Sequence, residues 1–444
     1  MEKRRFTSSD GLFDYLMGFV NVEKGQKTEF KLDRMRWLCS ELGDPQESYA
    51  TIHVAGSKGK GSVSTMAARI LQAAGYRTGL YTSPHILRWK ERISLAGDEM
   101  PEELLLAAAG EVVPLVDGIP AERFPGGELP TYFELTTLIG FCAFRTAGCE
   151  RVVVETGLGG RLDSTNVVSP RASVITPIEL EHTEWLGDTI PLIASEKAGI
   201  IKAGRPCYTS AQRPEAREVF ARTCAERGCE LREAPLLAPA GEIRVGPEGT
   251  SALLRFAPGS ALAARLGGSL AVRSPLVGEL QAGNMALALL AAAETDLRVD
   301  AAAAVEGLAR ASLPARFQVL PGNPPVVLDG AHTPNSVAAT LASFEALFPG
   351  PKALLFACAH DKRHDELAAI LAPRFEQVTV TTPGSFKQSD PEAVRASFTA
   401  AAPGTALVRE TGAAIDLALG RARAAGLPLL VTGSFYLCAE FLKR

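Results

Sequence analysis

The sequence predicts an α/β protein built around a mostly parallel sheet, with a second and smaller α/β domain towards the carboxyl end. Short apolar runs alternate with helical segments along most of the chain, which is typical of βαβ units. A glycine-rich turn joins one such run, Thr51–Ala55, to the helical segment Val63–Ala74. The alternation restarts after Ser312–Arg316, which favours a second domain. With 444 residues, the chain is long enough for two or three domains.

The larger first domain is expected to span residues 1–308. Its other predicted elements are strands at Arg151–Val154 and Val174–Thr176 and helices at Ile190–Ala198 and Gly283–Glu294. Residues 205–275 are richer in alanine, proline and glycine, and they predict a small β-rich excursion or an irregular insertion. The extended pieces expected there are Glu242–Val245 and Ala252–Phe256.

The second domain is expected to span residues 309–444 and to be Rossmann-like, with strands and helices in alternation. The predicted strands are Val326–Leu328, Lys352–Ala357, Gln377–Thr381 and Leu429–Thr432, and the predicted helices are Ser336–Phe348 and Asp365–Phe375. Loops at the carboxyl ends of parallel strands are where ligands bind, so polar residues at those positions are the candidates for function.

Composition excludes several classes of function. The formal net charge of −4 does not indicate the basic surface that nucleic-acid binding needs. No run reaches the roughly 18 to 20 apolar residues of a membrane span. The charged residues 1–5 precede no long apolar stretch, so we expect no signal peptide. Eight cysteines without a Cys-x-x-Cys pair favour reduced thiols, and we expect a cytoplasmic protein without nucleic-acid or membrane partners.

The turn after the first strand has the composition of a nucleotide phosphate loop. It comprises Gly56, Ser57, Lys58, Gly59, Lys60, Gly61 and Ser62. Backbone N–H groups of such a turn bind phosphate, Lys60 can reach the terminal phosphates, and Ser62 can offer a hydroxyl to Mg²⁺. Gly61 interrupts the common G-x-x-x-x-G-K-[ST] pattern, so the alternative is a glycine-rich turn with an exposed lysine. The strand before the turn and the helix after it favour the phosphate loop.

Polar residues also follow the next strands of the first domain. Glu155 comes directly after Arg151–Val154, and a carboxylate at the end of a parallel strand is a hard ligand suited to Mg²⁺. The alternative is a glycine-rich turn after an edge strand. His182 could bind or orient a metal, or it could be a structural or exposed loop histidine. Composition alone would make Lys197, near the end of a helix, a solvated surface residue.

The second domain carries a similar motif. Asp329 and His332 follow the strand Val326–Leu328 and could close over a nucleotide held by the first domain. The alternative is an aspartate-glycine turn that caps the strand. His360 and His364 are four residues apart, and with no third ligand nearby they favour a solvated helix start over a metal site.

Together these motifs resemble the folylpolyglutamate synthases and the bifunctional dihydrofolate synthase/folylpolyglutamate synthases of the Mur ligase superfamily. The resemblance covers nearly the whole chain, and it rests on the order and spacing of many segments. These are Leu42–Gln46, the phosphate loop, Ser83–His85, Glu91–Ile93, Thr131–Glu134, Glu155–Asn166, Glu181–Lys202, Gln281 with Asn284, Arg316, Asp329–His332 and Thr432–Tyr436. It implies an ATP-dependent ligase that adds L-glutamate to folate, and also to dihydropteroate, through an acyl phosphate.

The resemblance also implies roles for individual residues. The phosphate loop would hold ATP, with further ATP contacts from Asn284, Arg316, Asp329 and His332. Two Mg²⁺ ions would be held by Ser62, Ser83, Glu155 and His182. Catalytic roles would fall to Lys60, His182 and Lys197, the last as a carbamate formed with carbon dioxide. Arg92 would lie near the transferred group, and the pterin or folate pocket would be lined by Thr131, Phe133 and Asp163.

Four positions depart from the family pattern. Lys58, Glu181, Leu280 and Thr333 stand where asparagine, aspartate, histidine and asparagine are usual. These departures remove no predicted metal ligand. They leave open which acceptor the protein uses, and whether it has one synthase activity or two. A different Mur-type amino-acid ligase and a nucleotide-dependent regulatory module are the alternatives. We expect a monomer, with a monovalent cation as an additional ligand.

Overall fold

The computed structural model describes residues 6–20, 32–360, 362–384 and 388–444, and the predicted α/β class is confirmed. The charged residues 1–5, and Asp361 beside His360, lie outside the described residues. Two large sheets and one small sheet account for all the described strands. Within the same ranges, no helix is long and apolar enough to cross a membrane.

The first sheet has eight strands in the order β4-β3-β2-β5-β1-β6-β7-β8. Neighbours from β2 to β8 pair in parallel, whereas β3 and β4 form an antiparallel edge. The strands are β1 (Ala50–Ala55), β2 (Thr78–Tyr81), β3 (Ile93–Leu95), β4 (Asp98–Glu99), β5 (Arg151–Glu155), β6 (Ala172–Ile175), β7 (Cys207–Thr209) and β8 (Leu231–Glu233). The carboxyl ends of β2, β5, β1 and β6 therefore lie side by side at one edge of the sheet.

Helices cover both faces of this sheet. The side chains of β5 alternate between the two faces, and each face packs into its own core. Val153 packs into a core with α4 (Lys60–Ala73), α12 (Leu280–Thr295) and α13 (Ala301–Ala309). Val152 and Val154 point into the opposite core with α1 (Ser9–Met17), α3 (Leu32–Glu41), α5 (Glu102–Asp117) and α6 (Tyr132–Thr146). A further core lies between α8 (Ile190–Ala198) and α9 (Pro214–Glu226). The remaining short helices of this region are α7 (Thr183–Leu186), α10 (Ala234–Leu237) and α11 (Ala261–Leu266).

The prediction of one excursion over residues 205–275 is wrong for its first part. Strands β7 and β8, with α9 between them, extend the main parallel sheet. Only the later part leaves it, as the three-stranded antiparallel sheet β9 (Ala240–Gly246), β10 (Gly249–Arg255) and β11 (Ser269–Ser274). Strands of three residues are too short to show a period in the sequence, so the sequence does not predict β7 and β8.

The C-terminal region is a second α/β layer structure, with the six-stranded order β12-β13-β17-β14-β15-β16. Only β12 is antiparallel to its neighbour. The strands are β12 (Gln318–Leu320), β13 (Val326–Leu328), β14 (Ala353–Phe356), β15 (Gln377–Val380), β16 (Ala406–Leu407) and β17 (Leu429–Thr432). The helices are α14 (Pro334–Leu347), α15 (His364–Leu371), α16 (Pro391–Thr399), α17 (Thr411–Ala425) and α18 (Phe435–Leu442).

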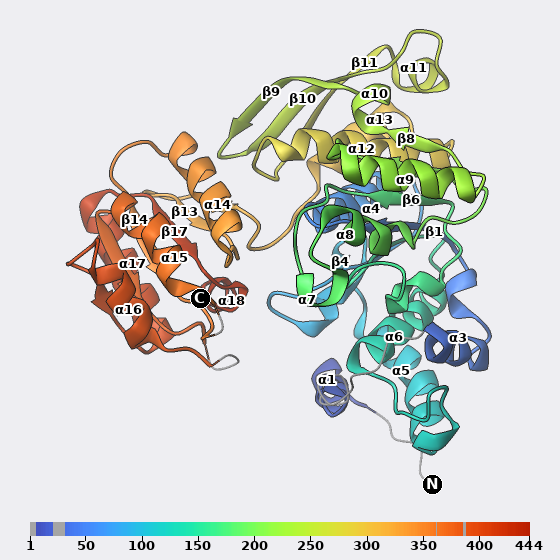
Figure 1. Ribbon diagram of the computed structural model, residues 1–444, viewed down its shortest axis with the longest axis horizontal. Helices are drawn as coiled ribbons and strands as arrows, with labels where there is room; N and C mark the ends of the chain where they lie inside the picture. Colours follow the sequence, from blue (N-terminus) through green and yellow to red (C-terminus); the bar gives the residue numbers. More distant parts are fainter. Residues whose placement is uncertain (1–5, 21–31, 361, 385–387) are drawn as a thin grey trace.

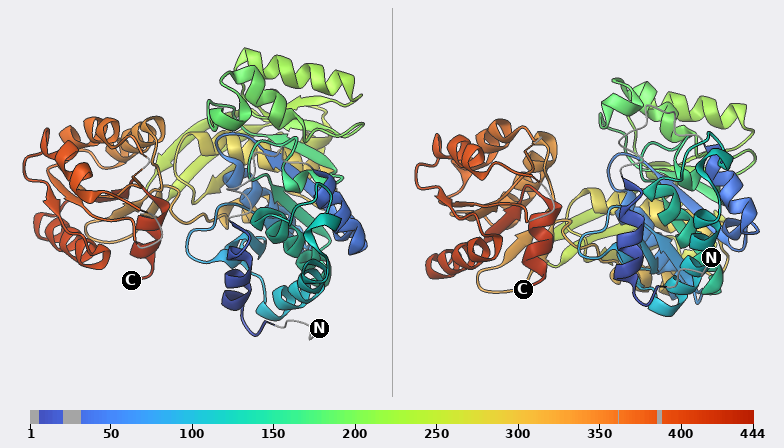
Figure 2. Two further views of the ribbon diagram at one scale, coloured as in Figure 1. Left: turned by 60° about the horizontal axis from the view of Figure 1, so that its bottom comes forward. Right: turned by 90° about the horizontal axis from the view of Figure 1, so that it is seen from below.

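This C-terminal region lies beside the first region rather than on top of it, as the orange and red ribbons show in Figures 1 and 2. Residues 310–317 connect α13 to β12. Three apolar side chains of the first region pack against the C-terminal cores: Val245 and Val277 on one, and Ile86 on the other. The division at 308/309 falls next to the connecting segment, and independent folding of the two parts stays a prediction.

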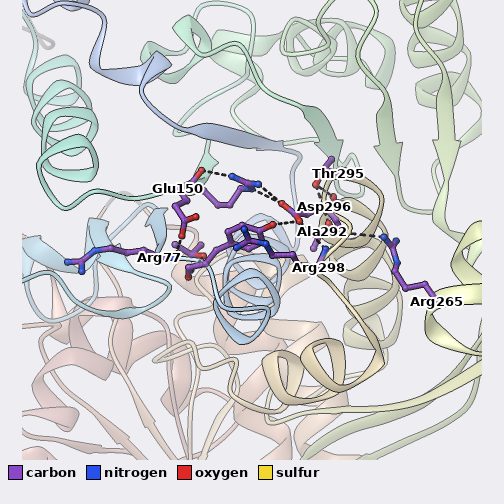
Figure 3. Close-up of polar contacts among 11 residues, drawn as sticks. Arg77, Glu150, Arg265, Ala292, Thr295, Asp296 and Arg298 are labelled. Atoms are coloured by element: carbon purple, nitrogen blue, oxygen red, sulfur yellow. Dashed lines mark hydrogen bonds and ion pairs between the residues drawn. The ribbon is translucent and has the colours of Figure 1, made fainter.

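The amino ends of the strands are held together by Asp296, which follows α12 (Figure 3). Its carboxylate accepts hydrogen bonds from Arg151 Nε at 2.8 Å, from the Arg298 N–H at 3.2 Å and from the Tyr76 hydroxyl. The guanidinium groups of Arg151 and Arg298 also lie over the Tyr76 ring, at 4.2 and 4.5 Å from its centroid. This network stabilises the amino ends of the strands. The predicted functional residues lie at the opposite end of the sheet, after the carboxyl ends of the strands.

Candidate active site

The turn between β1 and α4 is shaped by two glycines. Gly56 has φ +146°, and a Cβ there would lie 1.8 Å from Thr176 Oγ1. Gly59 caps α4 with φ +86°, and a Cβ there would lie 2.9 Å from Asn284 Oδ1. Any larger side chain would separate the turn from β6 or from α12. The structure thus places the predicted Asn284 directly against the phosphate loop.

Some backbone donors of this loop are already occupied. The N–H groups of Ser57 and Lys58 both donate to Pro177 O, at 2.9 and 3.2 Å. These two N–H groups are therefore occupied by a carbonyl group in this structure, and ATP binding by Ser57 and Lys58 stays a prediction. The first turn of α4 leaves the N–H groups of Lys60, Gly61 and Ser62 without helical partners, because no carbonyl precedes them in the helix. An anion would bind to that group of donors.

Two lysines meet at one carbonyl group of the loop. Lys60 Nζ donates to Gly56 O at 2.8 Å, and Lys197 Nζ donates to the same oxygen at 2.9 Å. Lys197 is only 1% exposed, so the interpretation of Lys197 as a solvated surface residue is wrong. Its position depends on Gly160, because a Cβ there would lie 3.0 Å from Lys197 Cα. Burial and the charge of Lys60 lower the pKa of Lys197 to about 8.

Glu181 stabilises this pair of cations. Its Oε1 accepts a hydrogen bond from Lys197 Nζ at 2.9 Å. Although burial opposes ionisation, the charges of Lys60 and Lys197 hold the pKa of Glu181 below its usual value. His182, the next residue, is exposed and begins α7 with φ +47°. Its ring makes no hydrogen bond with any described residue, so its metal and catalytic roles stay predictions.

Glu155 ends β5 beside the phosphate loop. Its carboxyl oxygens lie 3.9 Å from the position of a Cβ on Gly61, and its side chain is 3% exposed. Within the described ranges it accepts one hydrogen bond, from the Ser83 N–H to Oε2 at 3.2 Å. Burial raises the pKa of Glu155, against the opposing charges of Lys60 and two arginines. The structure therefore brings Ser83, Glu155 and the Ser62 turn together, as the sequence predicts.

The C-terminal region presents a second group of predicted residues to this edge. Asp329 follows β13 and accepts hydrogen bonds from the N–H groups of Phe317 and Ala331, at 2.7 and 2.8 Å. His332 Nδ1 lies 2.8 Å from Gly330 O. Burial lowers the pKa of His332, and the charges of Arg316 and Lys58 act in the same direction. The segment that leads into this group lies against the phosphate loop, since Leu313 Cδ1 is 3.8 Å from the position of a Cβ on Gly61.

The predicted substrate residues surround the loop after β5. Phe133 lies against Gly157, where a Cβ would come within 2.4 Å of its ring. Both N–H groups of Gly157 and Leu158 donate to Asp163 Oδ2, at 2.9 and 2.8 Å. Thr131 caps α6, with its hydroxyl accepting from the Glu134 N–H. These contacts bring the three residues together, whereas their binding of a substrate stays a prediction.

Arg92 completes this side of the site. Its Nε donates to His85 Nδ1 at 2.9 Å, and its guanidinium lies 5.7 Å from the centre of the Tyr132 ring. Burial and the charge of Arg92 lower the pKa of His85 to about 4. The sequence singled out neither His85 nor Tyr132 as a functional residue. Their signal was present in the Ser-Pro-His and Thr-Tyr-Phe segments, but a sequence pattern does not show that both side chains contact Arg92.

Among the described residues, no group of three or more histidine, cysteine, aspartate or glutamate side chains could hold a metal ion. The donors present are a single buried carboxylate with spare acceptor capacity and two serines. This set fits a cation that takes most of its ligands from a phosphate-bearing substrate, as Mg²⁺ usually does.

Comparisons with known proteins identify the family of the chain. Residues 315–435 match the family model described as Mur ligase, glutamate ligase domain. A Bacillus subtilis protein named dihydrofolate synthase/folylpolyglutamate synthase is 34% identical over 346 residues, which cover 76% of this chain and 77% of that protein. A folylpolyglutamate synthase structure from Mycobacterium tuberculosis, complexed with ADP and AMPPCP, has a TM-score of 0.83 at 29% identity, covering 96% of this chain and 98% of that one.

A longer relative comes from Haloferax volcanii and is named probable bifunctional folylpolyglutamate synthase/dihydropteroate synthase. It is 35% identical over 418 residues, which cover 92% of this chain and 47% of the relative. The chain thus spans about half the length of that relative. From the extent of these matches, the chain belongs to the folylpolyglutamate synthase and dihydrofolate synthase family of Mur ligases.

Proposed function

We propose that this protein is an ATP-dependent ligase that joins L-glutamate to a folate, and also to dihydropteroate, through an acyl phosphate. One observation carries the proposal. Two lysines, a helix N-terminus and a buried carboxylate converge on one edge of the first sheet. The ADP and AMPPCP bound by the Mycobacterium tuberculosis relative support ATP as the phosphoryl donor.

The chemistry requires an activated carboxylate. A carboxylate oxygen of the acceptor attacks the γ-phosphorus of ATP, ADP leaves, and an acyl phosphate forms. The amine of glutamate then attacks the acyl carbon, and phosphate leaves as the amide forms with loss of a proton. Phosphoryl transfer asks the protein mainly for positioning and charge neutralisation.

The residues present can meet those demands. Lys60 would leave Gly56 O to contact the transferred phosphoryl group, and the N–H groups of the first turn of α4 would bind the other phosphates. Asn284, Arg316, Asp329 and His332 would contact the nucleotide from the two regions. Closure of the C-terminal region over the first would exclude water from the acyl phosphate.

The site fits Mg²⁺, which would neutralise charge on the phosphates when bound. Glu155 and Ser83 would hold one ion with Ser62, and His182 would assist with a second after its loop moves inward. A monovalent cation is a further proposed ligand. Thr131, Phe133 and Asp163 would line the pterin pocket, and Arg92 would bind the acceptor near the reacting carboxylate. The protein is proposed to act as a monomer.

Lys197 is proposed to carry a carbamate in the active enzyme. A neutral amine attacks carbon dioxide and releases one proton, and a pKa of about 8 gives Lys197 more neutral amine at physiological pH than an ordinary lysine. The modification would exchange a cation for an anion beside Gly56. It would also break the ion pair with Glu181, since two anions would then face each other.

The test is glutamate-dependent ADP formation by the purified protein, with dihydropteroate and with tetrahydrofolate as acceptor. Turnover with both supports two activities, and turnover with tetrahydrofolate alone supports a polyglutamylating enzyme. Lys60→Ala is the control, and it should lower the rate by about 10²-fold or more without unfolding the protein. Failure of both acceptors, with glutamate and ATP at saturation, would overturn the folate assignment.

A further inference from the structure

Arg92 stands on a loop that is rigid before any substrate arrives. The loop joins β2 to β3, and the Thr82 N–H closes it on Arg92 O at 3.1 Å. Inside it, the carboxylate of Glu91 accepts hydrogen bonds from the N–H groups of three residues, Ile86, Leu87 and Arg88, at 2.7 to 2.8 Å. The backbone on both sides of Arg92 is therefore fixed by hydrogen bonds.

The side chain of Arg92 is fixed separately, by His85 on the opposite arm of this loop. Arg92 Nε donates to His85 Nδ1 at 2.9 Å. Since arginine only donates hydrogen bonds, this ring nitrogen is the acceptor. The imidazole is itself held edge-on by Phe13 of α1, with ring centres 6.0 Å apart and planes at 89°. The guanidinium in turn lies over the Tyr132 ring.

This arrangement decides which edge of Arg92 is available. A guanidinium offers a carboxylate either Nε with one terminal nitrogen or both terminal nitrogens. His85 occupies Nε, and none of the described residues makes a hydrogen bond or ion pair with Nη1 or Nη2. Arg92 therefore has its end-on edge available for a ligand, on a loop whose Ser83 N–H reaches Glu155 at 3.2 Å.

We propose that His85 is a positioning residue, which holds Arg92 so that its two terminal nitrogens receive the carboxylate of the acceptor beside the phosphate loop. This proposal rests on the proposed function and names one determinant of acceptor binding. Without His85, the guanidinium could rotate about its last torsions and present other edges, and the acceptor would bind in several orientations.

The number of bonds in each side chain gives a matched set of variants. Asn carries Oδ1 at the same number of bonds from Cα as His Nδ1, so His85→Asn keeps the acceptor of Arg92 Nε. Gln carries its polar atoms one bond farther out, and Leu carries none. His364→Leu, which removes a histidine of similar exposure from α15, controls for the loss of an imidazole.

The experiment measures KM for dihydropteroate and for ATP, with kcat, in these variants. His85→Leu and His85→Gln should raise the acceptor KM about tenfold, as expected for a lost hydrogen bond to a charged group. The ATP KM should stay within about twofold, and His85→Asn should restore most of the loss. An Asn variant no better than Gln, or an equal rise in the ATP KM, would overturn the proposal.

A double-mutant cycle tests whether His85 acts through Arg92. In an Arg92→Ala background, His85→Leu should have no further effect on the acceptor KM. Independent, additive losses would refute the positioning role. In a Trp37→Phe, Trp185→Phe background, Trp89 of the same loop is the remaining tryptophan, and quenching of its fluorescence is the expected readout of acceptor binding without turnover.

Measuring acceptor binding as well as turnover distinguishes failure of the role of His85 from failure of the proposed function. Wild-type protein that binds and converts dihydropteroate, with unchanged behaviour in His85→Leu, overturns the role of His85 alone. Wild-type protein that binds and converts neither dihydropteroate nor tetrahydrofolate overturns the proposed function and the role of His85 with it.

Discussion

Two carboxylates stand at equivalent places in the two sheets, and their surroundings differ. Glu155 is the last residue of β5 and Asp329 comes directly after β13, each before a loop that faces the site. Asp329 accepts three hydrogen bonds, from the N–H groups of Phe317 and Ala331 and from Thr340 Oγ1. Glu155 is 3% exposed and accepts one, from the Ser83 N–H, within the described part of the chain.

The difference separates a structural carboxylate from one that needs a ligand. A buried carboxylate without enough donors is unfavourable, and a protein retains it where an absent cation or substrate completes its shell. Asp329 shapes the β13 loop even without nucleotide, since its oxygens hold the chain on both sides. Glu155 instead keeps acceptor capacity for a cation. The same position in two parallel sheets thus serves two purposes.

The largest expected effect is on the rate. Glu155→Gln keeps the size and an acceptor for the Ser83 N–H but removes the charge, so turnover should fall by about 10² to 10³-fold. The free energy of unfolding should not decrease, because the ionised group is buried with few partners. Steady-state kinetics and urea unfolding of the same preparation measure both quantities. A rate within tenfold of the wild type would place the cation elsewhere.

The converse variant, Asp329→Ala, should act on stability. It leaves the N–H groups of Phe317 and Ala331 without their acceptor, and the expected loss is about 2 to 4 kcal/mol of unfolding free energy. Hydrogen exchange gives a local readout, because these two amides should lose protection before others in the C-terminal sheet. Unchanged protection would mean that Asp329 is not what holds this loop.

The smallest expected effect is on how the free energy of unfolding depends on pH, through Lys197 of the same site. The pKa of Lys197 is lowered to about 8 in the folded protein, so between about pH 8 and 10.5 the unfolded chain binds more protons. Lys197 alone should therefore add up to about 1.4 kcal/mol of unfolding free energy per pH unit in that window. Lys202, whose pKa is also lowered to about 8 by burial, contributes a similar slope. Buried thiols whose pKa is raised, such as Cys39, Cys142 and Cys149, contribute the opposite slope above about pH 9.

Lys197→Met isolates the contribution of the active-site lysine. It should lower the slope of the unfolding free energy against pH, relative to the wild type, by up to about 1.4 kcal/mol per unit between pH 8.5 and 10, measured by urea unfolding. Lys202→Met is the matched control outside the site. The same slope in Lys197→Met as in the wild type would contradict the lowered pKa.

Much of this arrangement could be predicted from the sequence, since strands with β-branched residues precede the motifs. The residues just after β1, β5, β6 and β13 were identified because parallel strands present their carboxyl-end loops at one edge. The phosphate loop could be recognised despite Gly61, because its flanking strand and helix were evident. Local patterns thus located the site, and a family resemblance supplied the proposed roles.

What could not be predicted depends on contacts between distant segments. Lys197 reads as a surface residue, and its burial follows from the close packing of Gly160 against α8. The occupation of the Ser57 and Lys58 N–H groups by Pro177 is likewise a contact across more than a hundred residues. Periodicity reports which face a residue occupies, but not which neighbour takes its hydrogen bond.

The shared carbonyl of Gly56 has a consequence for the end of each catalytic cycle. Two ammonium groups share this oxygen, and among the described residues only Lys197 of the two has an ion pair, with Glu181. The ammonium group of Lys60 is thus the one that a phosphate-bearing molecule can draw away from the carbonyl group. Under the proposed function, Lys60 would leave Gly56 O when ATP binds and return to it when ADP and phosphate depart, so the same carbonyl group would take part in product release.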